Sequence, residues 1–114
     1  MAYVQELMAD WGVVSARKMF GGYGLYRDGL MFALIAEDEL YFKVDRDNMA
    51  EFETMHSHPF VYQSKARTVK MSYWCAPCAC LETPADMHKW CLSAYAAALR
   101  TSAQKSSRYP EQTK

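Results

Sequence analysis

Seven consecutive apolar residues, Leu30 to Ala36, constrain the fold of this chain more than any other feature. The run is too short to cross a membrane, and turn residues flank it on both sides, so it predicts a buried β-strand. Successive side chains of a strand point to opposite faces, which places its even-numbered residues on one face and its odd-numbered residues on the other. We therefore expect a sheet with a central strand that is apolar on both sides.

The residues around this strand predict further antiparallel strands. Asp28-Gly29 is typical of a two-residue hairpin, because a type I′ turn needs positive φ at both positions. Leu40 to Val44 and Thr68 to Trp74 alternate between apolar and polar residues, as half-buried strands do. Gly21-Gly22-Tyr23-Gly24 lacks the ending of a phosphate-binding loop, and we interpret its glycines as positive-φ or bulge positions before the first hairpin.

Three helices are expected beside the sheet. The first eleven residues carry apolar side chains at helical spacing. Asp45 is a suitable cap for a second helix, and Thr83-Pro84-Ala85-Asp86 is a well-formed start for a third. The predicted fold class is α+β, a two-layer domain with an antiparallel sheet in the order α-β3-α-β2-α. The domain is expected to span residues 1–100, with a flexible C-terminal tail from Thr101 to Lys114.

The composition limits the partners of the chain. Its 114 residues are 51% hydrophobic, which is enough for one domain with a packed core. The 13 basic and 13 acidic residues balance, so we expect no direct binding to nucleic acid. No leader and no membrane-spanning run is visible, which predicts a cytoplasmic protein with its four cysteines as reduced thiols.

Five motifs follow one another along the chain: Arg17-Lys18-Met19-Phe20-Gly21-Gly22-Tyr23-Gly24-Leu25-Tyr26, Leu40-Tyr41-Phe42-Lys43-Val44-Asp45, Pro59-Phe60-Val61-Tyr62, Val69-Lys70-Met71-Ser72-Tyr73, and Trp90. In this order and spacing they resemble the N-terminal domain of the TfoX (Sxy) family of bacterial competence regulators. The resemblance covers about residues 1–100 and implies the same order of helices and strands. It also implies a role in transcriptional control of DNA uptake, in concert with a cAMP-receptor-type activator and RNA polymerase. Full-length members of the family carry a second, C-terminal helical domain, which this sequence does not reach.

The cysteines, which are not part of the family pattern, indicate an alternative function. The spacing C-x2-C-x9-H-x2-C could supply four zinc ligands: Cys75, Cys78, His88 and Cys91, with Cys80 as a substitute. Cys91 also lies in the apolar stripe of the last helix, where a cysteine commonly packs as a small hydrophobic residue. The string from Trp74 to Cys78 resembles a thioredoxin active site, but the next helix start, which would have to stabilise a thiolate, is only at Thr83. A small zinc-binding or thiol-redox protein is thus the alternative, while our main expectation is no cofactor.

No group of residues matches a catalytic constellation, so we expect a non-enzymatic regulatory or protein-interaction module. Helices can cover one face of a two-layer domain, and each large apolar side chain left on the other face forgoes about 1.5–3 kcal/mol of burial. We therefore expect a homodimer, or a docking surface for a regulatory protein such as a transcription activator. The expected interface residues are Leu30, Phe32, Leu34, Tyr41 and Trp74. The alternative is that a helix or the tail of the same chain folds over that face.

Overall fold

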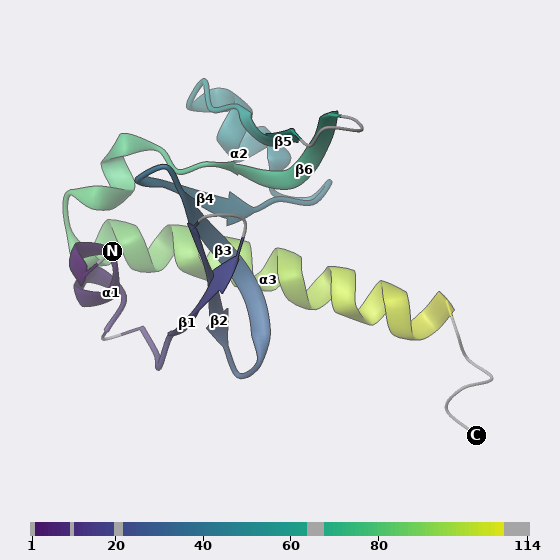
Figure 1. The fold of residues 1–114 in the computed structure, drawn as a ribbon, viewed down its shortest axis with the longest axis horizontal. Helices are drawn as coiled ribbons and strands as arrows, with labels where there is room; N and C mark the ends of the chain where they lie inside the picture. The colour runs from purple at the N-terminus through teal and green to yellow at the C-terminus, as the bar shows by residue number, and fades with distance from the viewer. Residues whose placement is uncertain (1, 10, 20–21, 64–67, 109–114) are drawn as a thin grey trace.

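The structure, a computed structural model, describes residues 2–9, 11–19, 22–63 and 68–108. Helices and strands follow one another along the chain as shown in Figure 1. In order they are α1 (Ala2–Met8), β1 (Ser15–Met19), β2 (Gly22–Arg27), β3 (Leu30–Ala36), β4 (Glu39–Lys43), α2 (Met49–Thr54), β5 (Pro59–Gln63), β6 (Thr68–Cys75), the 3-10 helix η1 (Cys78–Leu81) and α3 (Pro84–Arg108).

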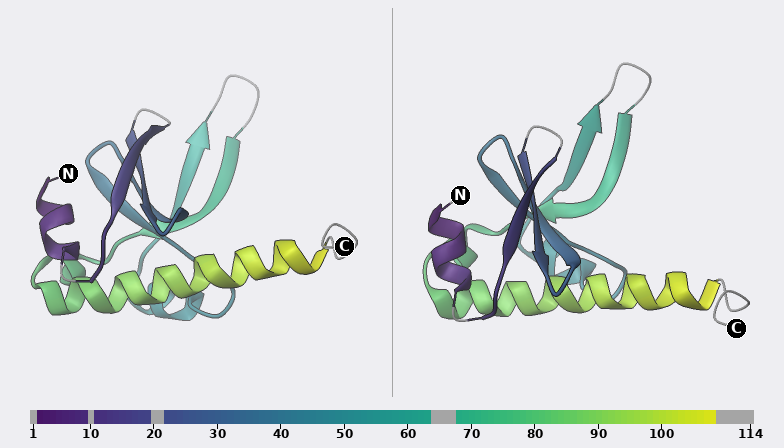
Figure 2. Two further views of the ribbon diagram at one scale, coloured as in Figure 1. Left: turned by 90° about the horizontal axis from the view of Figure 1, so that it is seen from below. Right: turned by 60° about the horizontal axis from the view of Figure 1, so that its bottom comes forward.

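The six strands form one antiparallel sheet in the order β1-β2-β3-β4-β6-β5. Helix α3 crosses one side of this sheet and packs against β3 and β4, and it also contacts α1 (Figure 2). Helix α2 lies on the same side, since its Phe52 ring is 5.0 Å from the Trp90 ring of α3. The predicted α+β class and the antiparallel sheet are confirmed.

Two local predictions are also confirmed. Asp28 and Gly29 both have positive φ, 53° and 79°, as a type I′ hairpin turn between β2 and β3 requires. At the start of α3, the Thr83 hydroxyl oxygen accepts a hydrogen bond from the Asp86 backbone N–H at 3.1 Å. This bond satisfies one of the N–H groups that the first turn of a helix leaves without a partner.

The structure differs from the predicted order in two places. Strand β1 is additional, and it is a polar edge strand with exposed Arg17 and Lys18. An edge strand pairs with a single neighbour and needs little apolar surface, so its sequence carries a weak signal. Helix α3 continues from the predicted domain end at Arg100 to Arg108, and the rest of the predicted tail, 109–114, lies outside the described residues.

A β-bulge in β3 decides which of its side chains face the helices. Residues 31 and 33 pair with consecutive residues of β2, which leaves Phe32 unpaired between them. One unpaired residue shifts the alternation by one position, so residues 32 and 33 both lie in the helix-side core. Leu34 packs in a second cluster on the opposite face. The predicted grouping of Leu30, Phe32 and Leu34 on one face is therefore wrong.

The sheet face opposite the helices is covered by the chain itself. The pairing of β5 with β6 is irregular between Pro59 and Val61, and β6 bends strongly along its length (Figure 2). Phe60 of β5 thereby packs over Tyr41, with ring centroids 4.9 Å apart, in a cluster that also contains Leu34. Leu34 keeps only 2% of its surface exposed. The prediction of an open second face is wrong, and the covering element is the β5–β6 hairpin rather than a helix or the tail.

None of the helices in the described ranges combines the length and the apolar character needed to span a bilayer.

Candidate functional site

Helix α3 is apolar on both of its faces. The inner face, which packs on the sheet, is the apolar stripe expected from the sequence, and its members are buried: Met87, Trp90, Cys91, Ala94 and Ala98. The opposite side of the helix consists of Ala85, Lys89, Leu92, Ala96, Leu99 and Ala103, and we call these six residues the α3 outer face. In Figure 2 the strands rise from one side of α3, and its other side points away from the sheet.

The α3 outer face carries exposed leucines where a surface helix normally carries charge. Leu92 is 61% exposed and Leu99 is 49% exposed. They lie two helical turns apart with Ala96 between them, so they belong to one stripe. Among the six residues of this face, Lys89 alone is charged. An exposed apolar stripe opposite the buried face of a helix is typical of a surface that contacts another molecule.

The turn before α2 holds one flank of α3 in place. Asn48 is 4% exposed, and its side-chain amide donates hydrogen bonds to the Lys43 carbonyl at 3.2 Å and to the Ser93 hydroxyl at 3.2 Å. Its side-chain oxygen accepts a hydrogen bond from the Asp45 backbone N–H at 2.8 Å. One buried amide therefore joins β4, α2 and α3, which fixes the helix relative to the sheet.

An ion pair strengthens the same flank. The Arg100 guanidinium donates to both carboxylate oxygens of Asp45, at 2.6 and 2.9 Å, and also lies 3.2 Å from Asp47. The hydrogen bonds from Arg100 are the main reason that the pKa of the Asp45 carboxyl lies below its ordinary value. Asp45 also accepts hydrogen bonds from the backbone N–H groups of Asp47 and Asn48. The prediction that it caps α2 is wrong, because the residue at the N-cap position is Asn48 and the side chain of Asp45 stabilises the turn before the helix.

Aromatic packing holds the other flank of α3. The Trp11 ring lies 5.1 Å from Phe32 and 5.7 Å from Tyr95 of α3. The Arg27 guanidinium lies 4.3 Å above the Trp11 ring, a cation–π distance. With both flanks tied to the sheet, the α3 outer face is presented as a rigid surface.

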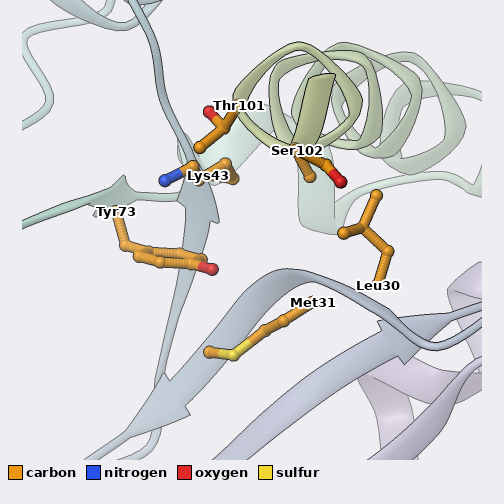
Figure 3. A pocket seen from close by; sticks show the side chains of 7 residues that line it. Leu30, Met31, Lys43, Tyr73, Thr101 and Ser102 are labelled. Atoms are coloured by element: carbon orange, nitrogen blue, oxygen red, sulfur yellow. The ribbon is translucent and has the colours of Figure 1, made fainter. Parts of the chain in front are cut away.

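A cavity of about 210 Å³ opens beneath the C-terminal half of α3 (Figure 3). It forms because the pairing of β3 with β4 stops at Ala33 and Phe42, so the two strands separate beyond this point. Its lining residues are Leu30, Met31, Lys43, Tyr73, Ala98, Thr101 and Ser102. Burial raises the pKa of the Tyr73 hydroxyl to about 12, so this group is a neutral phenol. The described lining contains no carboxylate, imidazole or thiol beside its lysine, tyrosine and hydroxyl groups.

The candidate zinc ligands do not assemble. No three His, Cys, Asp or Glu side chains of the described ranges come together in a group that could hold a metal ion. Cys78 is exposed whereas Cys80 and Cys91 are buried, and His88 has a buried Nε2 atom with no hydrogen-bond partner in the described structure. The donors point to different environments, so the residues do not fit a zinc site.

The thiols also lack the environment of a redox centre. Burial raises the pKa of the Cys75 thiol to about 11, and the hydrogen bond that this thiol donates to the Glu39 carboxylate at 3.4 Å acts in the same direction. Burial raises the pKa of the Cys80 thiol to about 12 and also raises the pKa of the Cys91 thiol. A reactive cysteine needs a lowered pKa, because the thiolate is the nucleophile. The arrangement therefore favours protonated thiols at Cys75, Cys80 and Cys91.

The structure disperses the five residues expected to form an interface. Leu30 and Phe32 lie on the helix side of the sheet, whereas Leu34 lies on the other side. Tyr41 packs against Phe60, and Trp74 packs in the helix-side core, where its ring centroid lies 6.5 Å from that of Phe52. Phe32 and Leu34 are buried, so neither is available to a partner.

Sequence analysis missed the α3 outer face, although its signal is local. Leu92, Ala96, Leu99 and Ala103 follow one another at intervals of four, three and four residues, which is the spacing of one helix face. The more hydrophobic inner stripe, with Trp90 and Met87, is by itself enough to predict the helix, so it masks the second stripe. The signal that identifies it is the near absence of charge on the side opposite the core.

The chain matches known proteins over most of its length. Residues 6–98 match the model of the TfoX N-terminal domain, which takes in the whole sheet and most of α3. The chain is also 30% identical over 71 residues to Protein Sxy of Escherichia coli (strain K12), which amounts to 61% of this chain and 34% of that protein. The match thus spans about a third of the length of that curated relative. The chain belongs to the TfoX N-terminal domain family.

Proposed function

We propose that this chain is a non-enzymatic regulatory module that contacts another protein in the control of genes for DNA uptake. Its membership of the TfoX N-terminal domain family and its similarity to Protein Sxy support this role. The balanced charge, 13 basic against 13 acidic residues, supports action through a protein rather than through the phosphates of DNA.

The observation that carries the proposal is the α3 outer face. Leu92 and Leu99 expose 61% and 49% of their surface on a helix that both flanks hold rigidly against the sheet. A pre-formed apolar surface loses little conformational entropy on binding, which favours its use as a contact site. The described lining of the cavity beneath α3 gives no comparable support to a catalytic role.

The proposal is tested with a transcriptional reporter for a DNA-uptake gene in the native host, after deletion of the gene for this chain. The wild-type chain should restore the reporter signal. The double variant L92E/L99E should fail to restore it at equal protein abundance, because each glutamate places a charge on the contact surface.

The matched control is Val13→Glu, since Val13 is 89% exposed and lies between α1 and β1, outside the α3 outer face. V13E should restore the signal as well as the wild type does. If deletion of the gene leaves the reporter signal unchanged, control of DNA uptake is ruled out. If L92E/L99E restores the full signal, the α3 outer face is ruled out as the contact surface.

A further inference from the structure

We infer that the partner seated on the α3 outer face is a second copy of this chain, with the two α3 helices antiparallel. The inference rests on the proposed function only in that it names the protein bound to the same surface. The shape of the face, its charge and its size each contribute to the argument.

The shape of the α3 outer face is self-complementary. A two-fold symmetric dimer uses the same patch on both copies, so that patch must fit itself. With the two-fold axis beside Ala96, the helices approach most closely where both copies carry a small side chain. Leu92 and Leu99 then lie about one turn to either side of this point, and Leu92 of each copy lies almost level with Leu99 of the other, so that the leucines pack against each other.

The charges near the face are complementary in this orientation. Antiparallel packing about Ala96 brings Lys89 of one copy beside the end of the face near Arg100 of the other. Arg100 is bound there by Asp45 and Asp47, at 2.6 and 3.2 Å, so two carboxylates and one guanidinium leave one net negative charge. The Asp47 side chain is 64% exposed, which leaves its carboxylate accessible to the Lys89 ammonium. A parallel arrangement would instead place the two Lys89 side chains beside each other.

The size of the face predicts a weak dimer. From Ala85 to Ala103 the helix is about 27 Å long, and a strip of roughly that length and about 10 Å width buries only about 540 Å² over both copies, which is less than the roughly 1,200 Å² of a stable interface. We therefore expect exchange between monomer and dimer, with the balance set by concentration.

The test combines sedimentation with a position-specific cross-link. Sedimentation velocity of the wild-type chain from about 5 to about 500 µM, a range that brackets the affinities expected of a small interface, should show a concentration-dependent shift from monomer to dimer. V13E should behave like the wild type. L92E/L99E should remain monomeric throughout, with an unchanged circular dichroism spectrum.

The cross-link reports the predicted axis. In a Cys78→Ser background, which removes the exposed thiol, Ala96→Cys should form a covalent dimer on mild oxidation because the two new thiols face each other across the axis. Ala103→Cys should not, because its two copies lie about 20 Å apart along the helices. Equal cross-linking at both positions would overturn the antiparallel arrangement.

The outcomes separate this inference from the proposed function. A wild-type chain that stays monomeric at every concentration, or L92E/L99E that dimerises like the wild type, overturns the dimer. If the wild type is monomeric while L92E/L99E still abolishes the reporter signal, a different protein occupies the face and the regulatory role stands. If the wild type dimerises but L92E/L99E restores the full reporter signal, the dimer is supported and the regulatory role of the face is ruled out.

Discussion

Gly22 lies at a position in β2 where the neighbouring strand leaves no room for a side chain. A Cβ atom there would overlap the carbonyl oxygen of Ile35 in β3, and backbone cannot move aside without breaking the ladder. At Gly29 a Cβ atom would meet nothing within 4 Å, and the only penalty is its positive φ of 79°.

We therefore expect Gly22→Ala to lower the free energy of unfolding by about 2–4 kcal/mol and Gly29→Ala by only about 1 kcal/mol. Urea denaturation of the two variants measures the difference. Equal losses would show that β2 and β3 can separate at this point without penalty.

Asp45 gives the stability a defined pH dependence. The folded state lowers the pKa of its carboxyl, mainly through the hydrogen bonds from Arg100, so the ionised form stabilises the fold. This contribution is present above the unfolded pKa of about 4 and is lost as the pH falls through the lower folded value. Asp45→Ala should therefore cost about 1–3 kcal/mol at pH 7 and clearly less near pH 2.5.

Urea titrations of the wild type and of Asp45→Ala at both pH values check this prediction. Glu53→Ala, at an exposed position of α2, serves as the carboxylate control. If the loss in the free energy of unfolding caused by Asp45→Ala is the same at both pH values, the loss comes from the turn alone and not from the ion pair.

Sequence reasoning succeeded at single residues with local causes. Asp28-Gly29 and the Thr83 cap follow from chemistry within four consecutive residues, and both were predicted correctly. The role of Gly22 was not, because we expected a positive φ or a bulge whereas the constraint comes from Ile35, thirteen residues further along the chain. A close approach between strands has no local signature.

At the scale of the element, β3 shows the limit of reasoning from alternation. The apolar run correctly predicted a strand, but its second face, which we expected to be open, is buried within the chain. The bulge at Phe32 was not predicted, because any apolar residue of the run could have been the unpaired one. Because of this bulge, Leu34 lies on the opposite face of the sheet from Phe32, so the residues predicted to form an interface do not share one face.

The two faces of α3 should respond differently to substitution. At about 1 µM, where a weak dimer dissociates, Leu92→Glu should change the free energy of unfolding by no more than about 0.5 kcal/mol, because its side chain projects into solvent. Ala94→Leu should cost about 1–3 kcal/mol, since Ala94 has no exposed surface and the sheet leaves no space for a larger residue. Thermal and urea denaturation measure both effects. A large loss for Leu92→Glu would mean that this residue supports the monomer itself.

At the scale of the whole molecule, the sheet has a core on each side. The larger core lies under the helices, and the smaller one contains Leu34, Phe60 and Tyr73. Fold class and family followed from patterns along the sequence, but the second core did not. The second core depends on the bend of β6, which brings Phe60 next to Tyr41. The curvature of a strand produces no hydrophobic periodicity, so the sequence pattern does not predict it.

Leu34→Ala tests whether the second core belongs to the monomer. We expect a loss of about 2–4 kcal/mol in the free energy of unfolding, with the dimer constant unchanged, because the leucine is buried within one chain. Val61→Ala, at a position of β5 that is 47% exposed, is the matched control and should cost about 0.5 kcal/mol or less. Urea denaturation and sedimentation report the two quantities, and loss of association without loss of stability would place Leu34 at an intermolecular contact.

The unpaired residue of β3 also bears on how this gene tolerates the loss of one codon. Phe32 has no partner residue in β2 or in β4, so a chain without it would keep the pairing of every other residue in both ladders. What such a chain would lose is the ring against which Trp11 rests, and with it an attachment of the N-terminal arm to the rest of the molecule. An in-frame deletion at this codon would therefore keep the strand register but leave a large cavity in the helix-side core, because Phe32 is fully buried there.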